Sequence, residues 1–236
     1  MLFFATPYCI NREAGSGMKN AFQEAHSGII AREGVPFILV FLFFSLSAFF
    51  FGALVAGTFL LFLTLFTAWF FRNPQRITPE YEKLVISPAD GKVIKIEELG
   101  GRDFLNGPCK KVSIFMSIFN VHVNRIPYEG HVELIRYQKG KFVSANRDKA
   151  STDNERNIIK IRGNDGNELL VVQIAGLIAR RIVCWITEGM YVRKGERFGM
   201  IRFGSCVELY LPPDCLISVN VGEKVVGGVT PIGCLK

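Results

Sequence analysis

The chain is divided by one long apolar stretch, which reads PFILVFLFFSLSAFFFGALVAGTFLLFLTLFTAWFF from Pro36 to Phe71. It contains no Asp, Glu, Lys, Arg or His, and this is typical of a membrane-spanning segment. One straight helix of this length would measure about 54 Å, whereas the hydrocarbon core of a bilayer is about 30 Å thick. We therefore expect residues 35–71 to form an anchor of two short helices with a turn near Phe51-Gly52 or Gly57. One long tilted helix is the alternative.

Basic residues flank the apolar stretch on both sides. Lys19 and Arg32 precede it, and Arg72 and Arg76 follow it. The positive-inside rule therefore predicts that both ends of the anchor, and the domain that follows, lie on the cytoplasmic side of the inner membrane. The net charge of +7 beside such a segment favours attraction to an anionic membrane surface. Nucleic acid is not expected as a partner, because no stripe of aromatic and basic residues is found.

Residues 1–34 precede the anchor as a lead-in. Apolar residues at helix-like spacing within 19–33 predict a short interfacial helix, with a disordered segment as the alternative. The start of the chain lacks the charged and apolar regions of a signal peptide. Translation from Met18 rather than Met1 is a hypothesis that N-terminal mass spectrometry of the native protein would test.

After Arg72 the sequence changes to short β-rich runs separated by Gly, Pro and Asn turns. No long amphipathic helix is evident, so residues 72–236 are predicted to form a mainly β domain. A pattern that occurs at Val192–Phe198 and again at Val219–Val225 predicts two strand–turn–strand hairpins with Gly in the turn, unless the similarity is due to chance. The expected strands are Leu84–Ile86, Lys92–Ile96, Lys111–Phe115, Glu133–Tyr137, Asn157–Ile161, Leu169–Ile174, Met200–Phe203 and Val207–Leu211.

The six cysteines and three histidines show no metal-binding pattern. No C-x-x-C occurs, which argues against a zinc site, and no metal is expected. The cysteine spacing also gives no disulfide framework. We therefore expect free thiols in a reducing compartment.

Three short segments supply polar groups that suit catalysis. Asp90 lies in the turn-like segment Ser87–Lys92, His122 lies in an apolar stretch, and Ser205 follows Gly204 where a Gly-Ser pair interrupts two β-rich runs. Each has a plainer structural explanation, namely a turn cap, a satisfied core histidine and the filling of a β-bulge. Together, Asp, His and Ser are the groups that activate a serine nucleophile.

The order of these motifs resembles the short form of the phosphatidylserine decarboxylase family. The resemblance runs from about Ile30 to the C-terminus and implies a β-rich fold of the folded β-sandwich or barrel-sandwich type. The family's cleavage motif is often Leu-Gly-Ser-Thr, and the flanking residues differ here, with Cys206 as a second nucleophile beside the Gly-Ser bond. The matching segments are Ala31–Gly34, Phe70–Arg76, Ser87–Lys92, Phe119–Arg125, Glu155–Asn157, Gln173–Arg181 and Phe203–Cys206.

By this resemblance, Asp90, His122 and Ser205 form the self-processing triad. Cleavage between Gly204 and Ser205 would leave two associated chains and convert Ser205 into a pyruvoyl group, the expected covalent cofactor. The mature enzyme would decarboxylate phosphatidylserine in the bilayer to phosphatidylethanolamine. A homodimer is one option for its assembly.

The candidates for substrate binding are Arg180, Arg181 and Asn124. Arginine forks suit phosphate oxygens, although these two arginines could also be ordinary surface charges. Asn124 is a candidate because polar residues crowd the segment around His122, which is unusual for a pure core. Glu155–Asn157 either shapes the site or forms a plain loop ion pair.

Three other functions would use the same features. A membrane-tethered serine hydrolase would keep Ser205 intact, and a non-enzymatic carrier with a lipoyl-like fold would expose a lysine such as Lys194 at a turn. A decarboxylase of another serine phospholipid would share the whole mechanism. The size of the protein on a denaturing gel separates the hydrolase from the self-cleaving enzyme.

Overall fold

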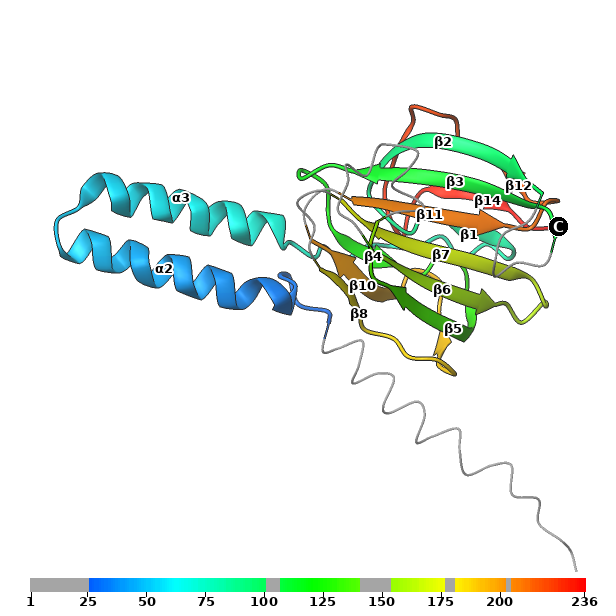
Figure 1. Ribbon diagram of the computed structural model, residues 1–236, viewed down its shortest axis with the longest axis horizontal. Coiled ribbons are helices and arrows are strands. Elements are labelled where there is room, and N and C mark those ends of the chain that lie inside the picture. Colours follow the sequence, from blue (N-terminus) through cyan, green and yellow to red (C-terminus); the bar gives the residue numbers. More distant parts are fainter. Residues whose placement is uncertain (1–25, 101–106, 141–153, 177–180, 203–204) are drawn as a thin grey trace, which may run out of the picture.

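The computed structural model describes residues 26–100, 107–140, 154–176, 181–202 and 205–236. It consists of a helical hairpin that projects from a β domain (Figure 1). The proposed start at Met18 and most of the lead-in lie outside the described residues.

The apolar stretch forms a helical hairpin. A short 3₁₀ turn, η1 (Arg32–Gly34), leads into α2 (Val35–Phe50), and α3 (Leu54–Phe70) returns toward the domain. The turn lies at one of the two expected places, where Gly52 has a φ of 75° that favours glycine. The alternative of one long helix is therefore wrong.

Gly57 serves close helix packing rather than the turn. A Cβ atom at Gly57 would lie 2.7 Å from the ring of Phe49, and the Ser45 hydroxyl donates to the Gly57 carbonyl oxygen at 2.9 Å. The segment Arg32–Phe50, with a mean hydropathy of 2.0, is long and apolar enough to cross a membrane, and Leu54–Phe70 is a shorter apolar helix. Composition and length therefore support membrane association.

The two ends of the hairpin are joined to each other and to the domain. The Ala31 N–H donates to the Phe71 carbonyl oxygen at 2.8 Å, and the Asn73 N–H donates to the Ile29 carbonyl oxygen at 2.7 Å. Phe70 and Phe71 are buried in a small apolar cluster with side chains of the β domain. The hairpin is thus packed onto the domain at its base.

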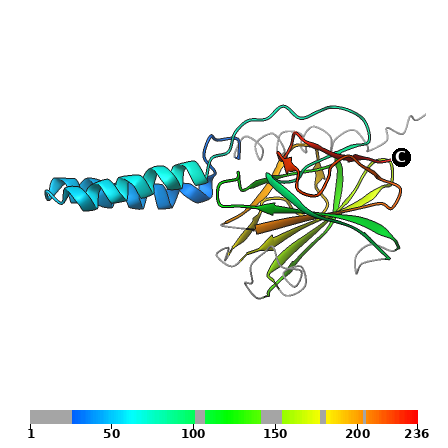
Figure 2. The ribbon, with the colours of Figure 1, turned by 90° about the horizontal axis from the view of Figure 1, so that it is seen from above.

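The β domain contains one eight-stranded sheet and two three-stranded sheets within the described residues. The large sheet has the order β13-β2-β3-β11-β7-β6-β5-β9 and is antiparallel throughout, and the small sheets have the orders β4-β10-β8 and β1-β14-β12. Figure 2 shows the large sheet curling around the core. The strands are β1 Leu84–Ile86, β2 Gly91–Leu99, β3 Cys109–Met116, β4 Val123–Arg125, β5 Gly130–Gln138, β6 Arg156–Arg162, β7 Glu168–Ala175, β8 Ile182–Cys184, β9 Tyr191–Val192, β10 Arg197–Ile201, β11 Ser205–Leu211, β12 Leu216–Ile217, β13 Lys224–Val225 and β14 Pro231–Cys234.

This architecture confirms the expected mainly β domain behind a helical hairpin. Each expected strand overlaps an observed one, although the strand predicted at Met200–Phe203 is observed from Arg197 to Ile201. Strands β9 and β13 lie in the two segments where a strand–turn–strand pattern was expected, whereas the short strands β4, β8, β12 and β14 were not predicted. They lack a long alternating pattern, and their partners in the sheets define them instead.

The repeated sequence pattern forms two turns of the same kind, but it does not form two hairpins. Gly195 and Gly222 have φ values of 83° and 96°, and each following glutamate accepts a hydrogen bond from the backbone N–H three residues earlier. The flanking strands pair elsewhere, because β10 pairs with β4 and β8, and β13 pairs with β2. The predicted hairpins are therefore wrong, whereas the predicted glycine turns are confirmed.

Strand β11 lies at the centre of the large sheet. All seven of its residues are buried, and it is hydrogen-bonded to β3 on one side and β7 on the other. Ser205 is its first residue, opposite Met116 at the end of β3 and Ala175 at the end of β7. The serine is thus fixed at one end of a central strand that is buried and hydrogen-bonded on both sides.

Candidate active site

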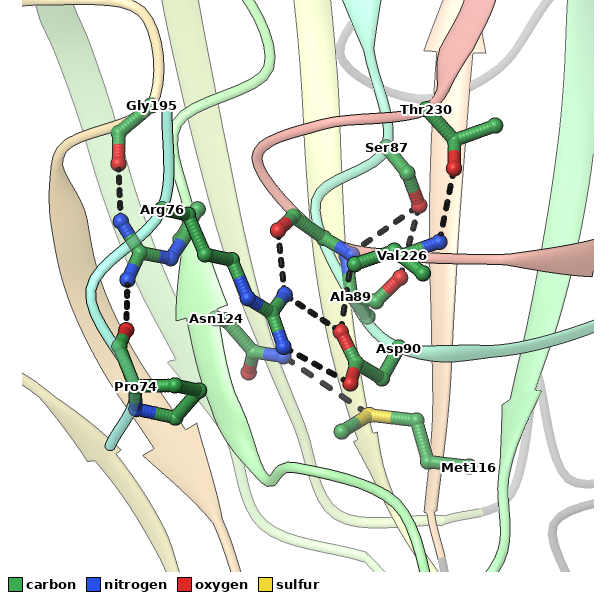
Figure 3. A network of polar contacts seen from close by, with 12 residues as sticks. Pro74, Arg76, Ser87, Ala89, Asp90, Met116, Asn124, Gly195, Val226 and Thr230 are labelled. Atoms are coloured by element: carbon green, nitrogen blue, oxygen red, sulfur yellow. Dashed lines mark hydrogen bonds and ion pairs between the residues drawn. The ribbon is translucent and has the colours of Figure 1, made fainter. Parts of the chain in front are cut away.

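Asp90 is held by a residue from the segment that follows the anchor. Its Oδ1 and Oδ2 atoms accept hydrogen bonds from Nη1 and Nη2 of Arg76 at 2.5 and 2.8 Å, and Oδ1 also accepts from the Gly227 N–H at 2.8 Å (Figure 3). Arg76 donates to the Gly227 carbonyl oxygen as well. The side chains of Arg76 and Asp90 are only 8% and 13% exposed. This paired geometry is the strong form of an arginine–carboxylate contact.

The turn around Asp90 does not need its carboxylate as a cap. Ser87 makes the local contact instead, since its hydroxyl donates to the Ala89 carbonyl oxygen at 2.7 Å. Directly after Asp90, a Cβ atom on Gly91 would lie 2.2 Å from the Phe115 carbonyl oxygen, so only glycine allows β2 to approach β3 so closely. The carboxylate is therefore directed away from its own turn, toward Arg76 and Gly227.

Two further arginines fix the path of the segment that carries Arg76. Arg125 donates to the carbonyl oxygens of Gly195 and Pro74 at 2.9 and 2.8 Å (Figure 3). Arg197 donates to the side-chain oxygens of Asn73 and Gln75 at 2.7 and 3.0 Å. Burial, with Arg197 and Arg76 close by, lowers the pKa of Arg125 to about 10, and Asp90 counteracts this shift. Asp90 therefore lies among several guanidinium groups.

His122 is completely buried beside the base of the anchor. It follows a turn in which the Asn120 side chain accepts from the Ser117 N–H at 2.9 Å, and its ring lies 4.3 Å from the ring of Phe70. Neither ring nitrogen has a hydrogen-bond partner among the described residues. Burial lowers the pKa of His122 to about 4, Arg72 lowers it further, and the Asn120 backbone and Asp90 oppose the shift. At neutral pH the imidazole is thus neutral and able to accept a proton.

The Ser205 hydroxyl lies against a methionine in the interior. Its Oγ donates to the Met116 Sδ at 3.4 Å, and the side chain of Ser205 is buried. The Asn124 amide donates to the same sulfur at 3.7 Å, and its carbonyl oxygen accepts from Gln173 at 2.8 Å. Gln173 in turn accepts from Asn157 at 3.0 Å. A buried chain of polar side chains therefore extends from Asn157 to the serine.

Cys206 faces away from this interior. It belongs to a separate apolar cluster on the other face of the sheet, as expected for the residue next to Ser205 in a strand. Burial strongly raises the pKa of the Cys206 thiol, and Glu208 adds to the shift. The thiol is therefore protonated and poorly suited to act as a second nucleophile.

The structure brings only some of the predicted site residues together. Asp90 acts on the charge state of His122 through space, but the two are not hydrogen-bonded, and Ser205 contacts Met116 rather than the imidazole. Gly204 and Arg180 lie outside the described residues. Arg181 is exposed next to β8.

Asn124 and Asn157 have structural partners inside the domain. The Asn124 side chain bonds to Met116 and Gln173, so its described contacts favour positioning Met116 against the serine rather than reaching outward. Asn157 lies in β6 and extends this chain, whereas Glu155 is buried, and one of its oxygens lacks a partner in the part of the chain that the structure describes. A substrate contact of Asn124 stays a prediction.

Sequence reasoning missed three groups of this site. Arg76 looked like a positive charge flanking the membrane, the Gly227 N–H carries no side-chain signal, and Met116 looked like ordinary core. The position of Arg76 in the matching segment Phe70–Arg76, close in sequence to the turn of Asp90, was the one signal for the ion pair between Arg76 and Asp90.

Comparison with known proteins identifies the family. Residues 63–233 match the profile of the family described as phosphatidylserine decarboxylase, and this range includes Asp90, His122 and Ser205. The chain belongs to the phosphatidylserine decarboxylase family.

Three relatives within the phosphatidylserine decarboxylase family cover nearly the whole chain, and each is named phosphatidylserine decarboxylase proenzyme. The protein of Syntrophus aciditrophicus is 57% identical over 209 residues, which cover 88% of this chain and 98% of that protein. The protein of Desulfotalea psychrophila is 47% identical over 204 residues, covering 86% and 95%. The protein of Wolbachia sp. subsp. Brugia malayi is 50% identical over 206 residues, covering 86% and 87%. The name proenzyme describes these relatives as precursors that are processed.

Proposed function

We propose that this chain is a phosphatidylserine decarboxylase proenzyme that cleaves itself between Gly204 and Ser205. Membership of the family and the length of the match to its proenzymes support the activity. The observation that carries the choice of nucleophile is the position of Ser205, buried at the start of the central strand. Family membership favours this function over a membrane-tethered serine hydrolase.

The proposed self-cleavage uses His122 as the base. A neutral imidazole takes the proton of Ser205 Oγ, and the charge of Asp90 stabilises the imidazolium that forms. The serine oxygen attacks the Gly204 carbonyl carbon, and the amide bond becomes an ester. Loss of the Cα proton and of the Gly204 carboxylate leaves dehydroalanine at position 205, and water converts it to a pyruvoyl group with release of ammonia.

This mechanism requires a rearrangement of the serine. Ser205 Oγ must leave Met116 and approach His122, because its contact with the thioether is the one described. A thioether is a weak acceptor, so little is lost when this contact breaks. Catalytic hydrogen bonds are often absent before the reacting state forms, and the unpartnered nitrogens of His122 are available for one.

The described residues fit the chemistry that a pyruvoyl group at position 205 would need. The two ring nitrogens of His122 are buried without partners among the described residues, so they are available to exchange a proton with a reacting group. A pyruvoyl group supplies a sink for the electrons that remain when the substrate carboxylate leaves as CO2. His122 would then return a proton to the product, and the buried setting excludes water from the departing carboxylate.

The two chains produced by cleavage, 1–204 and 205–236, are expected to stay associated. The small chain begins with β11, which is paired on both sides with strands of the large chain. Its later strands β13 and β14 pair with β2 and β1. Separation would therefore remove the strand that joins the two halves of the large sheet, β2-β3 and β7-β6-β5-β9. A homodimer stays a prediction.

The anchor gives this function a physical advantage. Phosphatidylserine resides in the bilayer, so a domain tethered by residues 35–71 meets it at a raised effective concentration. The domain that begins at residue 72 is proposed to face the cytoplasm at the inner membrane, because basic residues flank both ends of the anchor.

Release of CO2 tests the proposal. The purified full chain in mixed micelles is given phosphatidylserine labelled in the serine carboxyl group, and a parallel sample carries Ser205→Ala. We expect labelled CO2 and phosphatidylethanolamine from the wild type and neither from the variant. Release of fatty acid or of free serine without CO2 would instead indicate the hydrolase.

A further inference from the structure

Arg202 is a half-buried arginine near the site, and its side chain has an unmet hydrogen-bond donor among the described residues. Its Nε is buried and has no acceptor within the described ranges. Four other arginines of this region, Arg72, Arg76, Arg125 and Arg197, all donate to carbonyl, amide or carboxylate oxygens. An unpaired guanidinium N–H in the interior is costly, so an acceptor is expected there.

A second arginine lies directly beside it. The Arg202 N–H donates to the Arg181 carbonyl oxygen at 3.3 Å, which continues the antiparallel pairing of β10 with β8. Residues opposite each other in antiparallel strands place their side chains on the same face, and like charges in such a pair repel. Burial, and then Arg181, lower the pKa of Arg202, whereas Glu33 raises it. The two positive charges thus lie on the same face of paired strands.

Glu33 does not neutralise this pair. Its Oε1 accepts from the Trp185 indole N–H at 2.7 Å, and its Oε2 has no hydrogen-bond partner, Arg202 included, among the described residues. Its negative charge still attracts the arginines at longer range. The guanidinium groups of Arg181 and Arg202 together with the carboxylate of Glu33 therefore carry a net positive charge.

The arginine pair lies between the catalytic residues and the membrane anchor. The Ile201 N–H donates to the His122 carbonyl oxygen at 3.3 Å, so Arg202 follows the residue bonded to the proposed base. Arg202 also precedes Ser205 by three residues, a span of at most about 11 Å. On its other side, the guanidinium carbon lies 5.5 Å from the ring of Phe37 in the first turn of α2. Strands β8 and β10 are at the end of the domain nearest the hairpin (Figure 1).

This position matches the shape of a serine phospholipid. Its phosphate is separated from the serine amine only by the Cα and Cβ atoms of serine and one ester oxygen. A lipid that reaches position 205 with its amine, while its acyl chains stay in the bilayer, must hold its phosphate between the reacting group and the anchor. Arginine forks bind phosphate oxygens with paired, charge-assisted hydrogen bonds.

We propose that Arg202, together with Arg181, binds the phosphodiester of the lipid headgroup and so places the serine amine at position 205. This assignment rests on the proposed decarboxylase function and adds a residue that the sequence motifs did not single out. Such a contact would stabilise the bound substrate and the transition state equally. Its loss therefore raises KM and leaves kcat nearly unchanged. The same positive pair attracts any anionic lipid, so the test must separate substrate recognition from adhesion to the membrane surface.

Kinetics on the full chain in mixed micelles provide the first test. The variants are Arg202→Gln, Arg202→Lys and Arg181→Gln, with Arg193→Gln as a control at an exposed arginine. Intact mass gives the cleaved fraction of each, and rates are expressed per cleaved chain. Losing a hydrogen bond between charged groups should raise KM for phosphatidylserine roughly ten- to a hundredfold in Arg202→Gln. Arg193→Gln should match the wild type.

Two binding measurements identify the source of the phosphate. Glycerophosphoserine, which has the headgroup and no acyl chains, should compete with phosphatidylserine in the wild type and lose about tenfold or more in potency against Arg202→Gln. Inorganic phosphate should compete only weakly with both. Binding to phosphatidylcholine vesicles containing phosphatidylglycerol should be unchanged by the substitution. A loss of vesicle affinity equal to the rise in KM would assign Arg202 to the membrane surface and overturn the proposal.

The remaining outcomes are also decisive. If Arg202→Gln fails to cleave itself, Arg181→Gln and Arg202→Lys give the same comparison, and wild-type KM values in both would refute the site. Wild-type KM in a cleaved Arg202→Gln would refute it as well. If the wild type itself releases no CO2, the proposed function fails, whereas unchanged kinetics in the variants reject only the phosphate site.

Discussion

Replacing Arg76 with alanine should destabilise the domain and slow its maturation. The carboxylate of Asp90 would stay in a site where its side chain is 13% exposed, with the Gly227 N–H as its one described partner. Breaking a buried ion pair from one side costs about 3–5 kcal/mol because the other charge is left uncompensated. For a domain of this size, that corresponds to a fall in Tm of roughly 6–20 °C.

The assay uses the Ser205→Ala chain in detergent, so that every variant is a single uncut polypeptide. Urea unfolding followed by circular dichroism gives the free energy of unfolding with and without Arg76→Ala. Arg76→Lys keeps the charge but loses the paired geometry, and we expect a cost of about 1–2 kcal/mol. Arg193→Ala removes an exposed arginine and should change the free energy by less than about 0.5 kcal/mol.

A second substitution separates the ion pair from simple loss of packing. Adding Asp90→Asn to Arg76→Ala removes the stranded charge, so the double variant should recover at least about 1 kcal/mol relative to Arg76→Ala alone. In the cleavable chain, Arg76→Ala should also slow the appearance of the small chain, because Asp90 is no longer held near His122. An Arg76→Ala chain within about 1 kcal/mol of its parent, or no recovery in the double variant, would refute this role of Arg76.

Three further predictions concern the histidine, the neighbouring thiol and the hairpin. The pKa of His122 falls from its usual 6.5 to about 4 on folding, so between these pH values the unfolded chain binds one proton more than the folded chain. The free energy of unfolding should therefore drop by up to about 3 kcal/mol as the pH falls from 6.5 to 4. Urea unfolding of the Ser205→Ala chain should show this drop, and His122→Gln in the same background should remove it. Cys206→Ala should cleave itself within a few-fold of the wild-type rate, and iodoacetamide should not label Cys206 in the native protein; loss of cleavage would mean that the thiol takes part. Gly57→Val should destabilise the detergent-solubilised chain by about 1–3 kcal/mol, because its Cβ would lie 2.7 Å from the Phe49 ring, and an unchanged urea midpoint would contradict this close packing.

The longer strands were predictable because their signal is local. Strands β3, β6, β7 and β11 contain runs of β-branched and apolar residues that fit a pleated, buried surface. The hairpin was predictable for a similar reason, since an uncharged stretch too long for one membrane crossing must turn. The short strand β12 has only two residues, and no local pattern of that length identifies a strand.

The site was predictable only in part. Ordered motifs pointed to Asp90, His122 and Ser205, but their contacts depend on how distant segments pack. The partner of Asp90 comes from a linker whose path is fixed by Arg125 and Arg197, and nothing in the sequence gives that path. Burial of His122 by Phe70 likewise depends on the hairpin folding back onto the domain.

The most direct test is the intact mass of the mature, active protein beside that of Ser205→Ala. We predict two chains for the wild type, one ending at Gly204 and one beginning with a pyruvoyl group at position 205, and a single chain without CO2 release for the variant. An active wild-type protein that is one uncut polypeptide with an ordinary serine hydroxyl would contradict the proposed mechanism.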